Sequence, residues 1–224
     1  MGSLPDMGER LRQLGPTFWR ALAGVAQRTG VDLDALCATI QFESGFKAQA
    51  RNTQSRATGL IQFMPDTAKL YKTTIDDLFK MTELEQLPYV EKHFTAVKKR
   101  FPNLQSQDVC LSVLMPAHVG KSNDTVIMTK LPNEAVPPKD AYGQNKNLDT
   151  NKDGEITVGE VRQRYYYNLL ASVANRPRLE FDDQAPDVGA GGGSSSAPTK
   201  SQGAIVIVGL GVAAAIAALF RRIL

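Results

Sequence analysis

Residues 38–50 read "ATIQFESGFKAQA" and place a carboxylate at the end of an apolar helical stripe. Glu43 follows Ile40 by three positions and Leu36 by seven, so it continues the buried face of the predicted helix 32–43. Ser44 and Gly45 end that helix. Partial burial and the negative end of the helix dipole both raise the pKa of a carboxyl group, as a general acid requires. A salt-bridged or solvent-facing glutamate at a frayed helix end is the alternative, and this pattern alone does not decide between them.

A second stretch, "ATGLIQFMPDTA" at residues 57–68, places a glutamine inside an apolar run. Gly59 lies in a predicted loop, Gln62 lies between Ile61 and Phe63, and Pro65 begins a short helix. A buried amide needs a hydrogen-bond partner. A bound sugar is one such partner and a backbone carbonyl is the other.

Together, Glu43-Ser44-Gly45-Phe46 and the later "GLIQFMP" resemble the lytic transglycosylases of the soluble, goose-lysozyme-like type, which are similar to glycoside hydrolase family 23. The resemblance covers roughly residues 16–175. The chain is most similar to phage-encoded members of this type in the stretches "EQLPYVEKHF", "LMPAHVGK" and "NKNLDTNKDGEIT". It implies a mostly α, lysozyme-like domain that cleaves peptidoglycan between N-acetylmuramic acid and N-acetylglucosamine.

By this resemblance Glu43 is the sole catalytic acid/base, and the product carries a 1,6-anhydromuramoyl end. The 2-acetamido group of the substrate then replaces the second carboxylate of the usual glycosidase. The residues expected to bind or position the substrate are Ser44, Gln62, Phe63, Gln86 and Met115.

The chain departs from the family where many relatives carry an Ala-Tyr-Asn motif, because Leu114-Met115-Pro116 occupies that region. A hydroxyl from Tyr165, Tyr166 or Tyr167 is one replacement, although packing at helical spacing is the preferred interpretation of these tyrosines. His93 stands where relatives often have tyrosine. We interpret His93 and His118 as ordinary surface or groove histidines rather than metal ligands or general bases.

Residues 149–160, "DTNKDGEITVGE", fit the twelve-residue EF-hand loop. Its glycine is Gly154, and Thr157 occupies position 9. A calcium-free surface turn is the alternative. The expected calcium ligands are Asp149, Asn151, Asp153, the backbone carbonyl of Glu155, and Glu160. The prediction is one structural Ca²⁺ that fastens the C-terminal part of the domain to its catalytic part, with no cofactor for catalysis.

The rest of the globular region predicts helices with recognisable ends. Helix 16–29 has Pro16 at its start and Gly30 past its end. Asp32 caps the next helix, Thr82 and Glu85 form a capping box for a helix that contains Pro88, and Ser106 caps a helix disturbed by Pro116. The two cysteines, Cys37 and Cys110, are interpreted as reduced core thiols, with a single bridge as the alternative.

The chain divides by composition into an N-terminal extension (1–15), the lysozyme-like domain (16–180), a flexible linker (181–203), a transmembrane helix (204–220) and a basic tail (221–224). The apolar run 204–220 is uncharged and spans about 26 Å as a helix, and a buried core helix is the alternative. Its small-residue spacing, Gly209 with Ala213 and Gly211 with Ala215, is compatible with self-association and also arises by chance.

A net charge of +3 without a basic stripe argues against nucleic acid as a partner and suits a polyanionic wall. The N-terminus does not have the pattern of a secretory signal peptide, whereas Arg221 and Arg222 favour a cytoplasmic C-terminus. A cytoplasmic C-terminus would place the catalytic domain across the membrane, yet no signal pattern is present to export it. This conflict applies to a resident bacterial protein and is weaker for a virion protein. We therefore expect a membrane-anchored virion enzyme that degrades the wall during genome delivery. The alternatives are a role in host lysis, a bacterial tail-anchored enzyme, a hydrolytic muramidase, and a degenerate wall-binding or structural virion protein.

Overall fold

The computed structural model describes residues 7–130 and 141–167. The predicted linker, transmembrane helix and basic tail lie outside these ranges. Within them, no helix combines the length and apolar character needed to cross a bilayer.

The described elements are mostly helical, which confirms the predicted class. In chain order they are α1 (Met7–Thr29), α2 (Leu33–Ser44), α3 (Pro65–Leu70), α4 (Ile75–Lys80), α5 (Glu83–Arg100), η1 (Ser106–Asp108), α6 (Val109–Leu114), η2 (Pro116–His118), β1 (Val126–Thr129), α7 (Ala141–Asn145), η3 (Lys146–Leu148), β2 (Glu155–Thr157), α8 (Val158–Arg162) and the π-helical turn η4 (Gln163–Tyr167).

The helix ends follow local chemistry, as the sequence predicts. The Asp32 side chain accepts a hydrogen bond from the Ala35 N–H at 2.7 Å and caps α2. Thr82 and Glu85 form the reciprocal capping box of α5. Gly30 follows α1 with a φ of 66°. Helix α1 is kinked at Gly15, where φ is 77°, so the turns before Pro16 form a separate helical segment.

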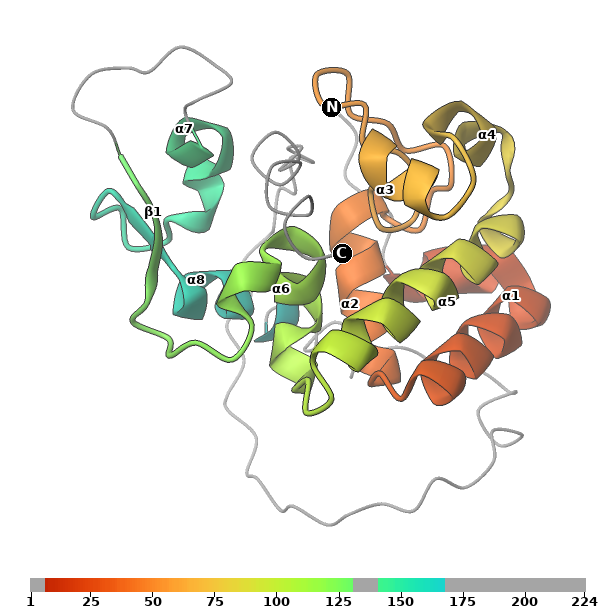
Figure 1. Cartoon of the computed structure of the whole chain (residues 1–224), viewed down its shortest axis with the longest axis horizontal. Coiled ribbons are helices and arrows are strands. Elements are labelled where there is room, and N and C mark those ends of the chain that lie inside the picture. The colour runs from red at the N-terminus through yellow and green to blue at the C-terminus, as the bar shows by residue number, and fades with distance from the viewer. Residues whose placement is uncertain (1–6, 131–140, 168–224) are drawn as a thin grey trace.

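Two hydrophobic clusters meet at α2. The larger contains Leu22 of α1, Leu36 and Ile40 of α2, and Phe94 of α5. The smaller contains residues of α6, both strands, α8 and η4, and Phe42 of α2 packs against it. In Figure 1, α2 lies in the middle of the molecule, with α1, α3, α4 and α5 to one side and α6, α8 and β1 to the other. The C-terminal end of α2 is therefore placed at the junction of the two clusters.

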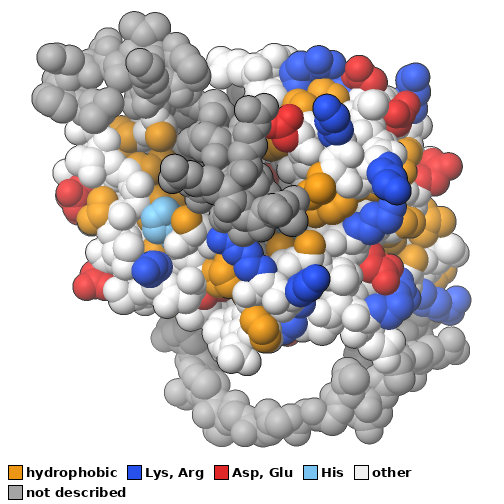
Figure 2. Space-filling view, in the orientation of Figure 1, with side chains coloured by type: hydrophobic (Ala, Val, Ile, Leu, Met, Phe, Trp, Pro, Cys, Tyr) orange, Lys and Arg blue, Asp and Glu red, His pale blue; other side chains and the backbone are white. Residues whose placement is uncertain are grey.

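The structure differs from the sequence interpretation at several elements. Strands β1 and β2 form an antiparallel pair that the sequence analysis did not predict, and α4 was also missed. Ser106 does not cap α6, because a 3₁₀ turn begins there instead. Cys37 and Cys110 are both buried and unbridged. Figure 2 shows Lys and Arg side chains interspersed with acidic ones over the described part of this face, in keeping with the mild net charge.

Candidate active site

Glu43 lies in the last turn of α2, at the junction of the two clusters. Its Oε1 atom is buried and has no hydrogen-bond partner among the described residues. Burial raises the pKa of this carboxyl group from 4.5 to about 8. The group therefore keeps its proton at neutral pH, which is the state that a general acid needs.

The turn after Glu43 is held in a left-handed conformation by an ion pair from two other helices. Gly45 and Phe46 have φ values of 59° and 57°. The Phe46 carbonyl accepts a hydrogen bond from Arg10 Nη2 at 3.0 Å, and the same nitrogen lies 2.8 Å from Glu83 Oε1. Glu83 Oε1 also accepts from the Ala48 N–H at 3.2 Å. Arg10 belongs to the predicted N-terminal extension, so this part of the extension is packed on the domain and contributes to the site.

Ser44 joins the end of α2 to the loop 57–64. Its hydroxyl lies 3.1 Å from the Ile40 carbonyl and 2.9 Å from the Leu60 carbonyl. The side chain is buried. Ser44 thus fixes the loop beside Glu43, and its hydroxyl is engaged with the backbone rather than directed at a substrate.

Gln62 has a φ of 52° in that loop. Its amide nitrogen donates to the carbonyls of Ala50 at 3.2 Å and Gly59 at 3.0 Å. Of the two partners considered from the sequence, the backbone carbonyl is the one found for this nitrogen. Gln62 is partly exposed. Its carbonyl oxygen forms no hydrogen bond to a described residue in this arrangement, so it remains a candidate for contact with a sugar.

Gln86 does not face the site as the sequence interpretation expected. It is fully buried, its Oε1 accepts from the Leu60 N–H at 2.9 Å, and its Nε2 donates to the Ala48 and Leu78 carbonyls at 2.9 and 2.7 Å. All the polar atoms of this amide are therefore used in joining three segments. A structural role replaces the expected sugar contact.

Phe63 and His93 belong to an aromatic cluster beneath the loop. Phe63 is buried, and its ring contacts those of Tyr71 and His93 edge-on. Burial lowers the pKa of His93 to about 4, so the imidazole is neutral. The expected surface or groove location is wrong for His93, and Phe63 supports the loop from inside.

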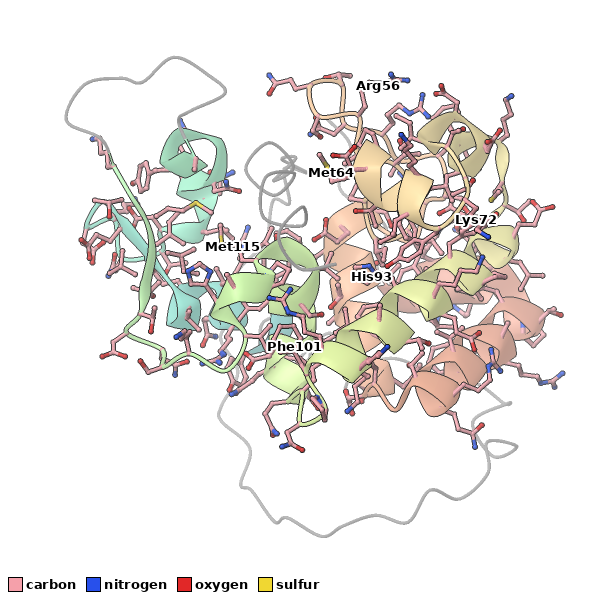
Figure 3. All side chains as sticks on the ribbon, in the orientation of Figure 1. Arg56, Met64, Lys72, His93, Phe101 and Met115 are labelled. Carbon is pink, nitrogen blue, oxygen red and sulfur yellow. The ribbon has the colours of Figure 1, made fainter. Side chains whose placement is uncertain are left out.

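Two methionines are labelled in this part of the molecule. In Figure 3, Met64, which precedes α3, lies near the C-terminal end of α2, and Met115, which follows α6, lies on the far side of α6 from α2. Both are partly exposed. Met115 was expected to bind substrate and Met64 was not, although Met64 directly follows Phe63 in the quoted motif.

The structure distinguishes Tyr165 from the other two candidate tyrosines. Its side chain is fully buried, its ring centroid lies 3.5 Å from that of Phe42, and its hydroxyl has no hydrogen-bond partner among the described residues. Burial first, and then the negative charge of Glu43, raise the pKa of Tyr165 well above its usual value. Tyr166 and Tyr167 are partly or largely exposed. Tyr165 packs in the smaller cluster, its hydroxyl is unpaired among the described residues, and it lies close enough to Glu43 for that charge to affect its pKa.

The residues of the predicted calcium loop are described, but their carboxylates do not converge. In residues 7–130 and 141–167, no group of three or more His, Cys, Asp or Glu side chains is arranged to hold a metal ion. The Glu160 carboxylate accepts bonds from the Thr150 and Thr157 N–H groups at 2.8 and 3.0 Å. Calcium binding therefore stays a prediction.

One comparison with known proteins, a family model, agrees with this site. Residues 21–89 match the family model described as the transglycosylase SLT domain. No curated protein and no solved structure matches the chain. The matched segment runs from α1 into α5 and includes Glu43 and the loop 57–64. The match confirms the resemblance to lytic transglycosylases of the lysozyme-like superfamily, a family of enzymes that cleave peptidoglycan.

Proposed function

We propose that the protein is a peptidoglycan lytic transglycosylase that cleaves the β-1,4 bond from N-acetylmuramic acid to N-acetylglucosamine and leaves a 1,6-anhydromuramoyl end. The observation that carries the proposal is the state of Glu43, a carboxyl group within the matched segment whose pKa is raised to about 8 by burial. Such a group can give a proton at neutral pH and take one back.

The chemistry balances with Glu43 alone. Its carboxyl group gives a proton to the glycosidic oxygen as the bond to C1 breaks. The resulting carboxylate then accepts the proton of the muramoyl 6-hydroxyl as that oxygen bonds to C1, so no water is consumed. The acetamido group of the substrate stabilises the positive charge at C1, as the family resemblance implies.

Tyr165 supports this cycle as a positioning residue. A phenol that donates a hydrogen bond stabilises a carboxylate more than a carboxylic acid. The buried Oη of Tyr165 and the buried Oε1 of Glu43 both have unused hydrogen-bonding capacity among the described residues. We assign Tyr165 the hydroxyl that is missing at Leu114-Met115-Pro116.

The test is mass spectrometry of muropeptides released from purified peptidoglycan. The wild-type protein should release fragments with anhydro ends, and Glu43→Gln should release none while still binding the wall. Glu91→Gln is the matched control, because Glu91 is paired with Arg28 on the surface of α5 and should be dispensable. Fragments heavier by one water would identify a hydrolytic muramidase instead. Wall binding without any release by the wild type would favour a degenerate wall-binding or structural protein.

We further propose that the enzyme is anchored in a membrane by residues 204–220 and carried in a virion that delivers it to the host envelope. The support is the uncharged run 204–220, the arginines that follow it, and the resemblance to phage-encoded members. Detecting the protein in the membrane fraction of purified particles is the test. Its absence from the particles would contradict the virion proposal and leave a role in host lysis or a bacterial tail-anchored enzyme.

A further inference from the structure

We infer that the loop 149–160 binds one Ca²⁺ and that the bound ion holds the Tyr165 side of the Glu43 site in place. The second half of this inference rests on the proposed role of Glu43, whereas the calcium site does not.

The first observation is an unpaired carboxylate oxygen at the start of the loop. Asp149 is 7% exposed, and its Oδ1 atom is buried without a hydrogen-bond partner among the described residues. Its Oδ2 atom accepts from the Gly154 N–H at 3.0 Å and from the Tyr142 hydroxyl. One oxygen is thus used to shape the loop, and the other is left for a cation.

The loop backbone makes tight turns at two positions, although its carboxylates do not yet converge. Lys152 and Gly154 have φ values of 61° and 90°. Asn151 Oδ1 accepts from the Asp153 N–H, and Asp153 Oδ1 accepts from the Glu155 N–H. Four carboxylates and one lysine give residues 149–160 a net charge of −3. A hard, oxygen-seeking divalent ion suits this set.

The loop also opens to solvent. The lining of a surface cavity of about 720 Å³ includes the acidic residues Asp149 and Asp153 and the basic residues Lys130, Lys146, Lys152 and Arg164. The cavity therefore reaches Asp149 from the solvent. The nearby positive charges reduce the affinity for a cation, which points to a site of moderate rather than high affinity.

Binding requires Glu160 to move. This carboxylate now accepts from the Thr150 and Asn151 N–H groups and completes the capping box with Thr157. Because the fully formed loop needs its last carboxylate on the ion, Ca²⁺ should draw Glu160 toward Asp149. The N–H groups it releases remain exposed to water.

A continuous set of contacts joins the loop to the catalytic acid. Strand β2 of the loop pairs with β1, with Ile156 opposite Met128. Helix α8 begins at Val158, contains Glu160, and runs directly into η4, which carries Tyr165. Tyr165 in turn stacks on Phe42, the neighbour of Glu43. An ion that fixes Glu160 therefore limits the movement of the helix that holds Tyr165.

Binding is tested on the full-length protein in mild detergent, freed of metal with chelator. Calorimetry should give one Ca²⁺ per chain with a Kd between about 10⁻⁶ and 10⁻³ M. Terbium luminescence excited through tyrosine should appear and be displaced by Ca²⁺. Saturating Ca²⁺ should raise the Tm by about 5–10 °C. No heat, no luminescence and no change in Tm would overturn the calcium site.

Variants distinguish the loss of a calcium ligand from the loss of the loop conformation. Glu160→Gln keeps a side chain that can complete the capping box, yet it should weaken Ca²⁺ binding at least about 10-fold, as should Asp149→Asn. Glu155→Gln is the matched control, since position 7 offers its backbone carbonyl, and its affinity should change little. Equal affinities in all three variants would overturn the assignment. Glu43→Gln should bind Ca²⁺ like the wild type, so a failure of the catalytic proposal and a failure of the calcium site are distinguishable.

Hydrogen exchange tests the coupling to the active site. Ca²⁺ should slow amide exchange in residues 149–167 and in residues 40–45 at the end of α2. Exchange in residues 89–100 of α5 serves as the internal reference and should stay the same. Slower exchange in the loop without any change in residues 40–45 would overturn the coupling.

Discussion

Glu43 is a residue whose protonation contributes to the stability of the whole chain. The carboxyl group belongs to α2, a helix that is otherwise largely buried, and its pKa is raised from 4.5 to about 8 by burial. Below pH 4.5 the group is protonated in both the folded and unfolded states, and above pH 8 it is ionised in both. Between these values only the folded state keeps the proton, so folding stability falls as pH rises.

The direction of this pH dependence predicts the stability of Glu43→Gln. Glutamine does not titrate, so the free energy of unfolding of the variant should increase relative to that of the wild type between pH 5 and pH 8. Each unit of pKa shift corresponds to about 1.4 kcal/mol, and because Glu43 remains partly exposed we expect about 2 kcal/mol in total. Urea denaturation at several pH values measures the difference. Glu91→Gln should show no such trend over this range, since its pairing with Arg28 lowers the pKa of Glu91.

Tyr165→Phe removes only the buried hydroxyl that we assign to the site. Because hydrogen bonds to charged groups are worth about 1.5–3 kcal/mol, the variant should lose roughly 10- to 100-fold in kcat. In its pH–rate profile the limb assigned to Glu43 should move to higher pH, because the Glu43 carboxylate has lost a hydrogen-bond donor. Tyr167→Phe is the control, since that hydroxyl donates to Gln107 on the surface. An unchanged pH profile in Tyr165→Phe would mean that Tyr165 only packs.

At the scale of elements, the loop 57–64 is fixed by a close approach between Gly59 and Gln86. A Cβ atom at Gly59 would lie 2.3 Å from Gln86 Oε1, and the φ of Gly59 is 88°. Ser44, the Thr58–Phe63 bridge and Gln86 together hold the loop against the end of α2. The loop therefore depends on one glycine and one buried amide.

Gly59→Ala should cost about 3 kcal/mol of folding stability, from backbone strain and from displacement of the Gln86 amide. Gly120→Ala is the matched control, because Gly120 has a similar φ of 77° and open space where the methyl group would lie. Its cost should be only about 1 kcal/mol. Chemical denaturation of both variants measures the difference. Equal costs would show that the contact with Gln86 contributes little.

The elements also show what the sequence alone predicts. Asp32 and the Thr82–Glu85 box were assigned correctly because a cap and its helix are a few residues apart. Gln86 was misplaced because two of its three partners, Leu60 and Ala48, are distant in sequence and the third, Leu78, lies in α4, a helix that was not predicted. The β1–β2 pair was missed because each strand has only three or four residues.

The same contrast between local and long-range contacts applies to the candidate active site. Glu43 was assigned from its own helical stripe and the motif that follows it. Tyr165 was one of three equivalent tyrosines, because only tertiary packing decides which ring reaches Phe42. Arg10 was placed outside the domain, since nothing near it in the sequence indicates its contact with Phe46.

At the scale of the whole molecule, a buried ion pair joins segments around the smaller cluster that are distant in sequence. Arg162 of α8 lies 2.7 Å from Asp108, and its Nη1 donates to Asn123 at 2.6 Å. The side chains of Arg162 and Asp108 are only 6% and 2% exposed. The Gly120 N–H donates to the other Asp108 oxygen at 3.0 Å, so three segments converge on this pair.

Asp108→Ala should therefore destabilise the protein by about 3–5 kcal/mol, because it leaves the Arg162 guanidinium buried without its partner. The double variant Asp108→Leu with Arg162→Met should recover most of this loss, since apolar side chains of similar size need no compensating charge. Glu91→Ala, which breaks the exposed pair with Arg28, should cost less than about 1 kcal/mol. Urea denaturation of the four proteins provides the comparison. If Asp108→Ala were as mild as Glu91→Ala, the apolar contacts of the smaller cluster would be enough to hold these segments together, and the pair would add nothing to the position of η4.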